Sequence, residues 1–276
     1  MDNIKRVIVF GIDGMGNSPQ MVEMPGVNRI FSRGLYTNNG QTEFPPKSGA
    51  VWGTILHGVL PDEHKITNDS AKYHLWPTDS PYPSIFRMIR KKKPESNLAS
   101  ICKWPQINRG MIEHNINVNL HTGFDWYVSL CDKSYLEKND VDFLFTVFDN
   151  VDHAGHKYGY FTDNFFEQVK KTDRQVSELI EIIERKGWFN DSLIMVVTDH
   201  GGGGGDPKDH GIDHPKDMTV SFAMCGPGIP HGEIPNFRNC DIPSIIISAF
   251  GIEKPSNWQG RTLQEVIQQS KLVSKL

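Results

Sequence analysis

The sequence predicts an α/β fold in which a mostly parallel central sheet is covered by helices on both faces. Three short apolar runs, at residues 7–10, 143–148 and 193–197, are rich in β-branched and aromatic residues and show no polar alternation. This composition is typical of strands that are buried on both faces. An acidic residue in a polar or glycine-rich turn follows each run. Such turns carry the sites of open α/β sheets, so the three runs are expected to share one site.

A long amphipathic helix is expected between the second and third apolar runs. Within residues 162–186, apolar side chains recur at three-to-four-residue spacing among charged ones: Val169, Val176, Leu179, Ile180 and Ile183. Thr162 or Asp163 is expected to cap the start of this helix, and Gly187 to end it. Strand, helix and strand then form one βαβ unit of a parallel sheet.

The remaining elements are less sharply marked. Repeated prolines divide residues 68–140, which we expect to form a substrate-facing insertion with loops. Within and after this stretch the sequence favours a helix at 84–92, strands at 98–102 and 219–222, and closing helices at 243–250 and 261–272. We expect residues 1–276 to form a single domain.

Charge and cysteine usage exclude several classes of protein. The net charge of -4 and the lack of long basic runs argue against a partner that is a nucleic acid duplex. The run at residues 90–93 is interpreted as a solvated helix end. The four cysteines are scattered without a C-x-x-C pair, which argues against a disulfide scaffold and a zinc ribbon: Cys102, Cys131, Cys225 and Cys240. With no signal-like or membrane-spanning run, we expect a cytoplasmic protein that has no membrane partner.

Two segments carry paired carboxylate and imidazole side chains. Asp199 and His200 are adjacent at the end of an expected strand and are followed by glycines, although the same letters also suit a plain turn. Asp152 and His156 stand four residues apart, so they face the same side of a helical turn while His153 points elsewhere. Oxygen and nitrogen ligands of this kind suit zinc or manganese.

Two further turns complete the candidate set. Asp13 follows the first strand between glycines, whose spacing does not match a dinucleotide-binding loop. Ser48 precedes a helical pattern, and a serine there is commonly only an N-cap. The same position surrounds an anion with backbone N–H groups and the positive end of a helix dipole, which suits a nucleophile attacking a phosphoryl group.

Taken together and in this order, these motifs resemble the alkaline phosphatase superfamily, and within it the nucleotide pyrophosphatase/phosphodiesterase branch. The resemblance covers most of the chain, from Asp13 to the Asp-His-Gly element at residues 199–201. It implies two divalent metal ions, most commonly zinc with manganese as an alternative. It also implies a metal-dependent phosphate mono- or diester hydrolase acting through a phosphoseryl intermediate on Ser48.

Carried over by position, the resemblance assigns one metal ion to four residues: Asp13, Ser48, Asp199 and His200. Asp152, His156 and a later histidine hold the other, with His210 favoured over His214. Asn68 lies one residue away from the position of a superfamily asparagine that donates to the phosphoryl oxygens, and it is a candidate for that role. The chain departs from the superfamily pattern at Lys65, where a glycine is usual, and near Ser221, where a proline is usual.

The substrate is expected to be a small phosphate ester, with a nucleotide as one candidate. Five aromatic residues could stack a base, although most suit a core equally well: Trp52, Tyr73, Trp76, Trp104 and Trp126. The alternatives are a phosphonate hydrolase or phosphomutase of the same superfamily, and a non-catalytic metal-binding homologue.

Overall fold

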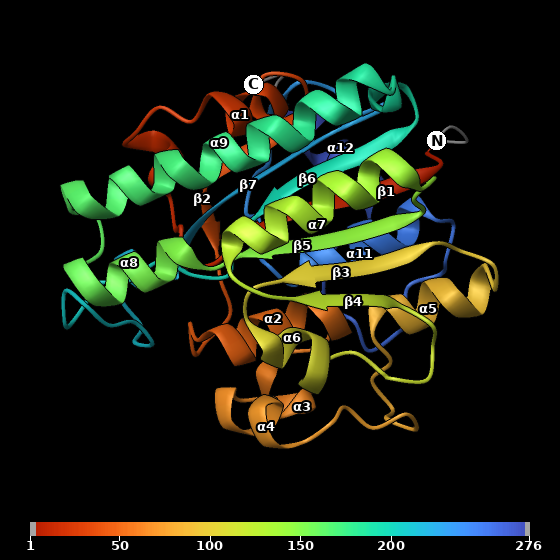
Figure 1. The fold of residues 1–276 in the computed structure, drawn as a ribbon, viewed down its shortest axis with the longest axis horizontal. Helices are drawn as coiled ribbons and strands as arrows, with labels where there is room; N and C mark the ends of the chain where they lie inside the picture. The colour runs from red at the N-terminus through yellow and green to blue at the C-terminus, as the bar shows by residue number, and fades with distance from the viewer. Residues whose placement is uncertain (1–3, 274–276) are drawn as a thin grey trace.

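A computed structural model describes residues 4–273 as one eight-stranded sheet between two layers of helices (Figure 1). The strands lie in the order β4-β3-β5-β1-β6-β7-β2-β8. Their bounds are β1 Arg6–Ile12, β2 Leu35–Gln41, β3 Leu98–Cys102, β4 Asn119–Thr122, β5 Phe143–Phe148, β6 Ser192–Val197, β7 Thr219–Cys225 and β8 Gly232–Glu233.

The sheet is mostly parallel, as predicted. β1 pairs in parallel with β5 and β6, β3 with β4 and β5, and β2 with β8. The exception is β7, which is antiparallel to both of its neighbours, β6 and β2. β1, β5 and β6 therefore end side by side at one edge of the sheet (Figure 1).

Helices cover the two faces of the sheet in separate layers. One layer packs around the long helix α9 and consists of α1 Pro25–Phe31, α7 Asp125–Lys138, α8 Asn150–Tyr158 and α9 Asp163–Arg185. The other is built around α2 and consists of α2 Ser48–His57, α3 Pro61–His64, α4 Asn68–Tyr73, α5 Ile85–Lys92, α6 Pro105–Gly110, α11 Asp241–Ala249 and α12 Leu263–Val273. Three short helical turns complete the chain: η1 Ser18–Gln20, η2 Trp188–Asn190 and α10 Pro215–Met218.

The central strand β1 serves both layers because successive side chains of a strand point to opposite faces. Val7 and Val9 join the apolar cluster under α2 and α11. Ile8 and Phe10 join the cluster under α1 and α9. This double burial explains why the run shows no polar alternation.

Most predicted elements are present. The three apolar runs are β1, β5 and β6, and the amphipathic pattern is α9, whose N-cap Thr162 accepts a hydrogen bond from the Phe165 N–H. Within residues 68–140, expected to be a substrate-facing insertion with loops, the predicted strand at 98–102 is β3, and β4 is a second strand that was not predicted. No helix within residues 4–273 combines the length and apolar character needed to cross a bilayer.

Candidate metal centre and nucleophile

The candidate residues gather at the edge where the central parallel strands end. Asp13 follows β1, and Asp199 and His200 follow β6. Asp152 lies in the first turn of α8, the helix that follows β5 in the chain. Ser48 is the first residue of α2. The topology thus brings four separate turns to one place, which is where α/β sheets bind their ligands.

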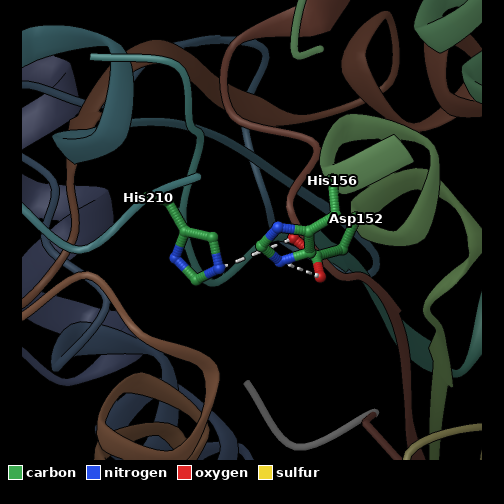
Figure 2. Close-up of side chains that lie close together, drawn as sticks. All are labelled: Asp152, His156 and His210. Atoms are coloured by element: carbon green, nitrogen blue, oxygen red, sulfur yellow. Dashed lines mark ion pairs between the residues drawn. The ribbon is translucent and has the colours of Figure 1, made fainter. Parts of the chain in front are cut away.

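The first group of ligand atoms comes from Asp152, His156 and His210 (Figure 2). One atom from each residue lies within 4.8 Å of the others. The Nε2 of His156 is 3.3 Å from Oδ2 of Asp152, one helical turn away, and the Nε2 of His210 is 3.8 Å from Oδ1. The structure therefore joins the i, i+4 pair of α8 to a histidine of a distant loop.

The second group is deeper and contains Asp13, Asp152 and His200, so Asp152 belongs to both groups. The Nε2 of His200 lies 3.2 Å from Asp199 Oδ2, 3.6 Å from Asp13 Oδ1 and 3.2 Å from the Ser48 hydroxyl oxygen. All four of these side chains are buried. The hydroxyl thus stands directly beside the carboxylates.

His156, His200 and His210 share one hydrogen-bonding pattern. The Nδ1 of each lies within hydrogen-bonding distance of a backbone carbonyl: His156 with Lys208 at 2.7 Å, His210 with Pro46 at 2.7 Å and His200 with Gly201 at 2.8 Å. A carbonyl only accepts, so each Nδ1 donates its hydrogen and each Nε2 is left to face the carboxylates. Histidines that ligate metals are oriented in this way by the group on their second nitrogen.

The crowding of buried carboxylates supplies a test of whether cations fit here. Burial, and then the charges of Asp199 and Asp152, raise the pKa of Asp13 well above its usual value. Burial also raises the pKa of Asp199 to about 7. Within residues 4–273, Asp13 Oδ1 and Asp199 Oδ2 are buried without a hydrogen-bond partner. Divalent cations beside these oxygens would satisfy both, so the donor set fits the two metal ions that the resemblance implies.

The histidines of the first group differ in their environment. A hydrogen bond with Asp152 raises the pKa of the half-exposed His156 to about 9. Burial, and then the neighbouring His200, lower the pKa of His210 to about 4. The rings of His200 and His210 stack with centroids 3.7 Å apart. His210 is therefore a neutral ligand candidate, whereas His156 must give up a proton before it can bind a metal ion.

Ser48 is not an N-cap. That position belongs to Lys47, whose side chain makes no capping hydrogen bond. Asn68 Oδ1 accepts a hydrogen bond of 2.7 Å from the Gly49 N–H. A Cβ on Gly49 would lie 2.5 Å from the Asn68 nitrogen, so only glycine lets α4 approach the candidate nucleophile this closely.

His214 and His153 lie outside both groups of ligand atoms. His214 is the N-cap of α10, and its Nδ1 accepts a hydrogen bond of 3.2 Å from the Lys216 N–H. This orientation is the reverse of that of the three clustered histidines, so the geometry favours His210 over His214. His153 is exposed on α8.

Two residues of the site were missed or misread in the sequence. Tyr160 donates a hydrogen bond to Asp152 Oδ1. Trp52, considered for base stacking, is fully buried, and its indole N–H donates to Asp13 Oδ2 at 2.9 Å. Trp52 lies within the apolar pattern of α2, 39 residues from Asp13 in the chain, and Tyr160 lies just past the end of α8, so neither position in the sequence indicates a contact with a carboxylate. The exposed Tyr73 and Trp126 keep an accessible aromatic surface.

Comparison with known proteins decides the family. Residues 7–219 match the family model of type I phosphodiesterase / nucleotide pyrophosphatase. The chain belongs to this family. The resemblance to the alkaline phosphatase superfamily is thereby confirmed, together with the predicted fold.

Individual members of the family are distant from the chain in sequence. Venom phosphodiesterase 2 and venom phosphodiesterase 1 of Crotalus adamanteus are each 19% identical over 244 residues, covering 71% of this chain and 26% and 25% of their own lengths. The chain spans about a quarter of the length of these curated relatives.

Solved structures match nearly the whole chain in fold. Murine ectonucleotide pyrophosphatase / phosphodiesterase 5, in an inactive form in complex with AMP, has a TM-score of 0.76 at 13% identity, covering 96% of this chain and 99% of that chain. The lipoteichoic acid synthase LtaP from Listeria monocytogenes has a TM-score of 0.69 at 16% identity, covering 96% and 76%.

Proposed function

We propose that this chain hydrolyses phosphate mono- or diesters through a covalent phosphoserine on Ser48, with two zinc ions held by the clustered carboxylates and histidines. One observation carries the proposal. His156, His200 and His210 each direct Nε2 at a carboxylate while Nδ1 is held by a backbone carbonyl, and His200 Nε2 lies 3.2 Å from the Ser48 hydroxyl. Nitrogen and oxygen donors in this arrangement suit zinc, with manganese as the alternative.

The ligand sets combine the observed geometry with the resemblance to the superfamily. Asp152, His156 and His210 would hold one cation. The resemblance assigns Asp13, Asp199 and His200 to the other, beside Ser48, and the geometry adds Asp152 to the group around Asp13 and His200. When bound, the cations would lower the pKa of the Ser48 hydroxyl and stabilise charge on the leaving oxygen.

The chain's own residues then account for two displacements. The Ser48 oxygen loses its proton to solvent and attacks phosphorus, so a phosphorus–oxygen bond to Ser48 forms as the bond to the leaving group breaks. The positive end of the α2 dipole and the side-chain NH2 group of Asn68 meet the charge on the phosphoryl oxygens. Water then attacks phosphorus, the bond to Ser48 breaks and the serine recovers a proton. Two in-line steps retain configuration at phosphorus.

The organic part of the substrate has room beside the nucleophile. A hollow of about 410 Å³ is lined by ten residues: Pro45, Lys47, Ala50, Pro61, Asp62, Lys65, Ile66, Thr67, Asn68 and Asp69. It borders the Ser48 turn and shares Asn68 with it. Its size falls within the range of small-molecule sites. The fold shared with a phosphodiesterase that binds AMP supports a nucleotide as the first substrate to test.

The decisive test replaces the proposed nucleophile. Ser48→Ala should reduce hydrolysis of p-nitrophenyl phosphate and its bis ester by at least about 1000-fold, because covalent catalysis is lost. Zinc content should stay near that of the wild type, since the carboxylates and histidines remain. Ser32 is exposed at the end of α1, so Ser32→Ala is the matched control and should keep full activity. Full activity of metal-replete Ser48→Ala would contradict the covalent route.

Substrate preference separates the proposal from its alternatives. Turnover of phosphonates in preference to both esters would favour a phosphonate hydrolase, and isomerisation of a phosphorylated sugar would favour a phosphomutase. Two bound cations per chain with no turnover of any of these compounds would favour a non-catalytic homologue.

A further inference from the structure

Tyr160 lies at the centre of the candidate site and makes a polar contact that the proposed mechanism does not use. It follows α8 directly, is 6% exposed, and donates its hydroxyl hydrogen to Asp152 Oδ1. Its ring meets the rings of His156 and His210 nearly edge-on, with centroids 5.8 Å and 6.1 Å away. One tyrosine therefore contacts all three members of the first ligand group.

The surrounding backbone is shaped to hold this ring. A Cβ on Gly155 would lie 2.4 Å from Cε1 of Tyr160, and a Cβ on Gly202 would lie 2.6 Å from Cε2. The two glycines belong to different segments, α8 and the loop after β6, and they flank opposite edges of the ring. The Tyr160 N–H is also fixed, because it donates to the Pro207 carbonyl at 2.8 Å. The hydroxyl therefore has one defined position.

The hydroxyl distinguishes the two oxygens of Asp152. Oδ1 accepts its hydrogen bond, whereas Oδ2 faces the Nε2 of His156 at 3.3 Å. A carboxylate that is engaged on one oxygen cannot rotate freely to offer both. Asp152 belongs to both ligand groups, so its orientation matters to the whole centre.

We propose that Tyr160 is a positioning residue of the metal centre: its hydroxyl holds Asp152 with Oδ2 toward His156 and thereby sets the affinity of the Asp152, His156 and His210 site for a divalent cation. This inference rests on the proposed function insofar as that site binds a metal ion. Mutation of a residue that hydrogen-bonds to a metal ligand commonly lowers metal affinity or activity by about 10- to 100-fold.

The competing explanation is that Tyr160 only fills space between Gly155 and Gly202. Tyr160→Phe separates the two explanations because it keeps the ring and removes the hydroxyl. We expect the zinc affinity of the site formed by Asp152, His156 and His210, measured by competition with a chromogenic chelator, to fall about 10- to 100-fold. Tyr158→Phe is the matched control, since Tyr158 lies on α8 with 45% of its side chain exposed.

A double-mutant cycle shows whether the effect passes through Asp152. In an Asp152→Asn background, adding Tyr160→Phe should change zinc affinity by less than about threefold. An equal loss in both backgrounds, or unchanged affinity in the single variant, would overturn the inference. Wild-type protein that binds no zinc would overturn it together with the proposed function. Zinc binding that depends on Tyr160 in a protein without esterase activity would overturn the proposed function alone.

Discussion

His210 and His214 lie four residues apart in one loop, yet only His210 turns its ring toward the carboxylates. His210 donates a hydrogen bond from Nδ1–H to the Pro46 carbonyl, and the His210 ring stacks on that of His200. The Lys216 N–H instead binds Nδ1 of His214 at the start of α10. The sequence left both histidines as candidates because their partners, Pro46 and Lys216, become visible only once the loop is folded against the nucleophile turn.

The two histidines provide a matched pair of variants. We expect His210→Ala to lower zinc affinity of one site by more than about 10-fold, because a direct ligand is lost. His214→Ala should change it by less than about threefold, with at most the stability loss of a missing helix cap, about 0.5–2 kcal/mol. Chelator competition with thermal unfolding of the metal-free proteins measures both. The reverse ranking of affinities would assign the ligand to His214.

At the scale of elements, the site depends on how α8 is anchored. The Asp125 carboxylate, from the start of α7, accepts hydrogen bonds from the backbone N–H groups of Asp149 and Asn150 at 3.1 Å and 2.9 Å. The Lys103 ammonium pairs with Asp149 at 2.5 Å. The helix that carries Asp152 is thus fixed by neighbours from two other segments. The sequence predicted the turn of α8 but not this anchoring, which joins positions far apart in the chain.

Some strands of the sheet could be predicted from the sequence and others could not. β1, β5 and β6 are buried on both faces, and their unbroken apolar runs predicted them. β4 is an edge strand with partly exposed, polar residues, and β2 carries polar residues at exposed positions near its end. Neither has the apolar composition on which such a prediction rests. The sequence therefore predicted the central strands of the sheet but missed the outer strands β4 and β2.

The packing of α2 makes stability depend on pH. His57, at its end, is fully buried, donates Nδ1–H to the Tyr82 carbonyl at 3.0 Å and lies against Trp76. Burial, and then the nearby His64, lower the pKa of His57 to about 3. The unfolded chain takes up this proton near pH 6.5, whereas the folded chain does not, so stability is lost as the pH falls.

This packing predicts a specific change with pH. Between pH 6.5 and pH 5 the His57 contribution should destabilise the fold by about 2 kcal/mol. His57→Gln retains an N–H donor for Tyr82 but does not titrate, so its loss of stability between pH 7 and pH 5 should be smaller by that amount. Urea unfolding of the metal-free proteins at the two pH values measures the difference. Parallel losses in both proteins would show that His57 is protonated in the fold.

At the scale of the whole molecule, the order β5-β1-β6 assembles the centre. Parallel pairing of these three strands places their ends together, so the turns bearing Asp152, Asp13 and Asp199 meet without long connections. The order of motifs along the chain was sufficient to predict this convergence, because parallel strands in an α/β sheet end at a common edge. The contributions of Tyr160 and Trp52 could not be predicted, since side-chain contacts do not follow from strand order.

The most direct test of the central claim is anomalous scattering from crystals of the zinc-loaded protein. The account predicts two zinc peaks per chain, each about 2.0–2.2 Å from its ligands. One should lie among Asp152, His156 and His210, and the other among Asp13, Asp199 and His200 beside the Ser48 hydroxyl. A single peak, or peaks bound away from these side chains in zinc-replete protein, would contradict a two-cation centre at this edge of the sheet.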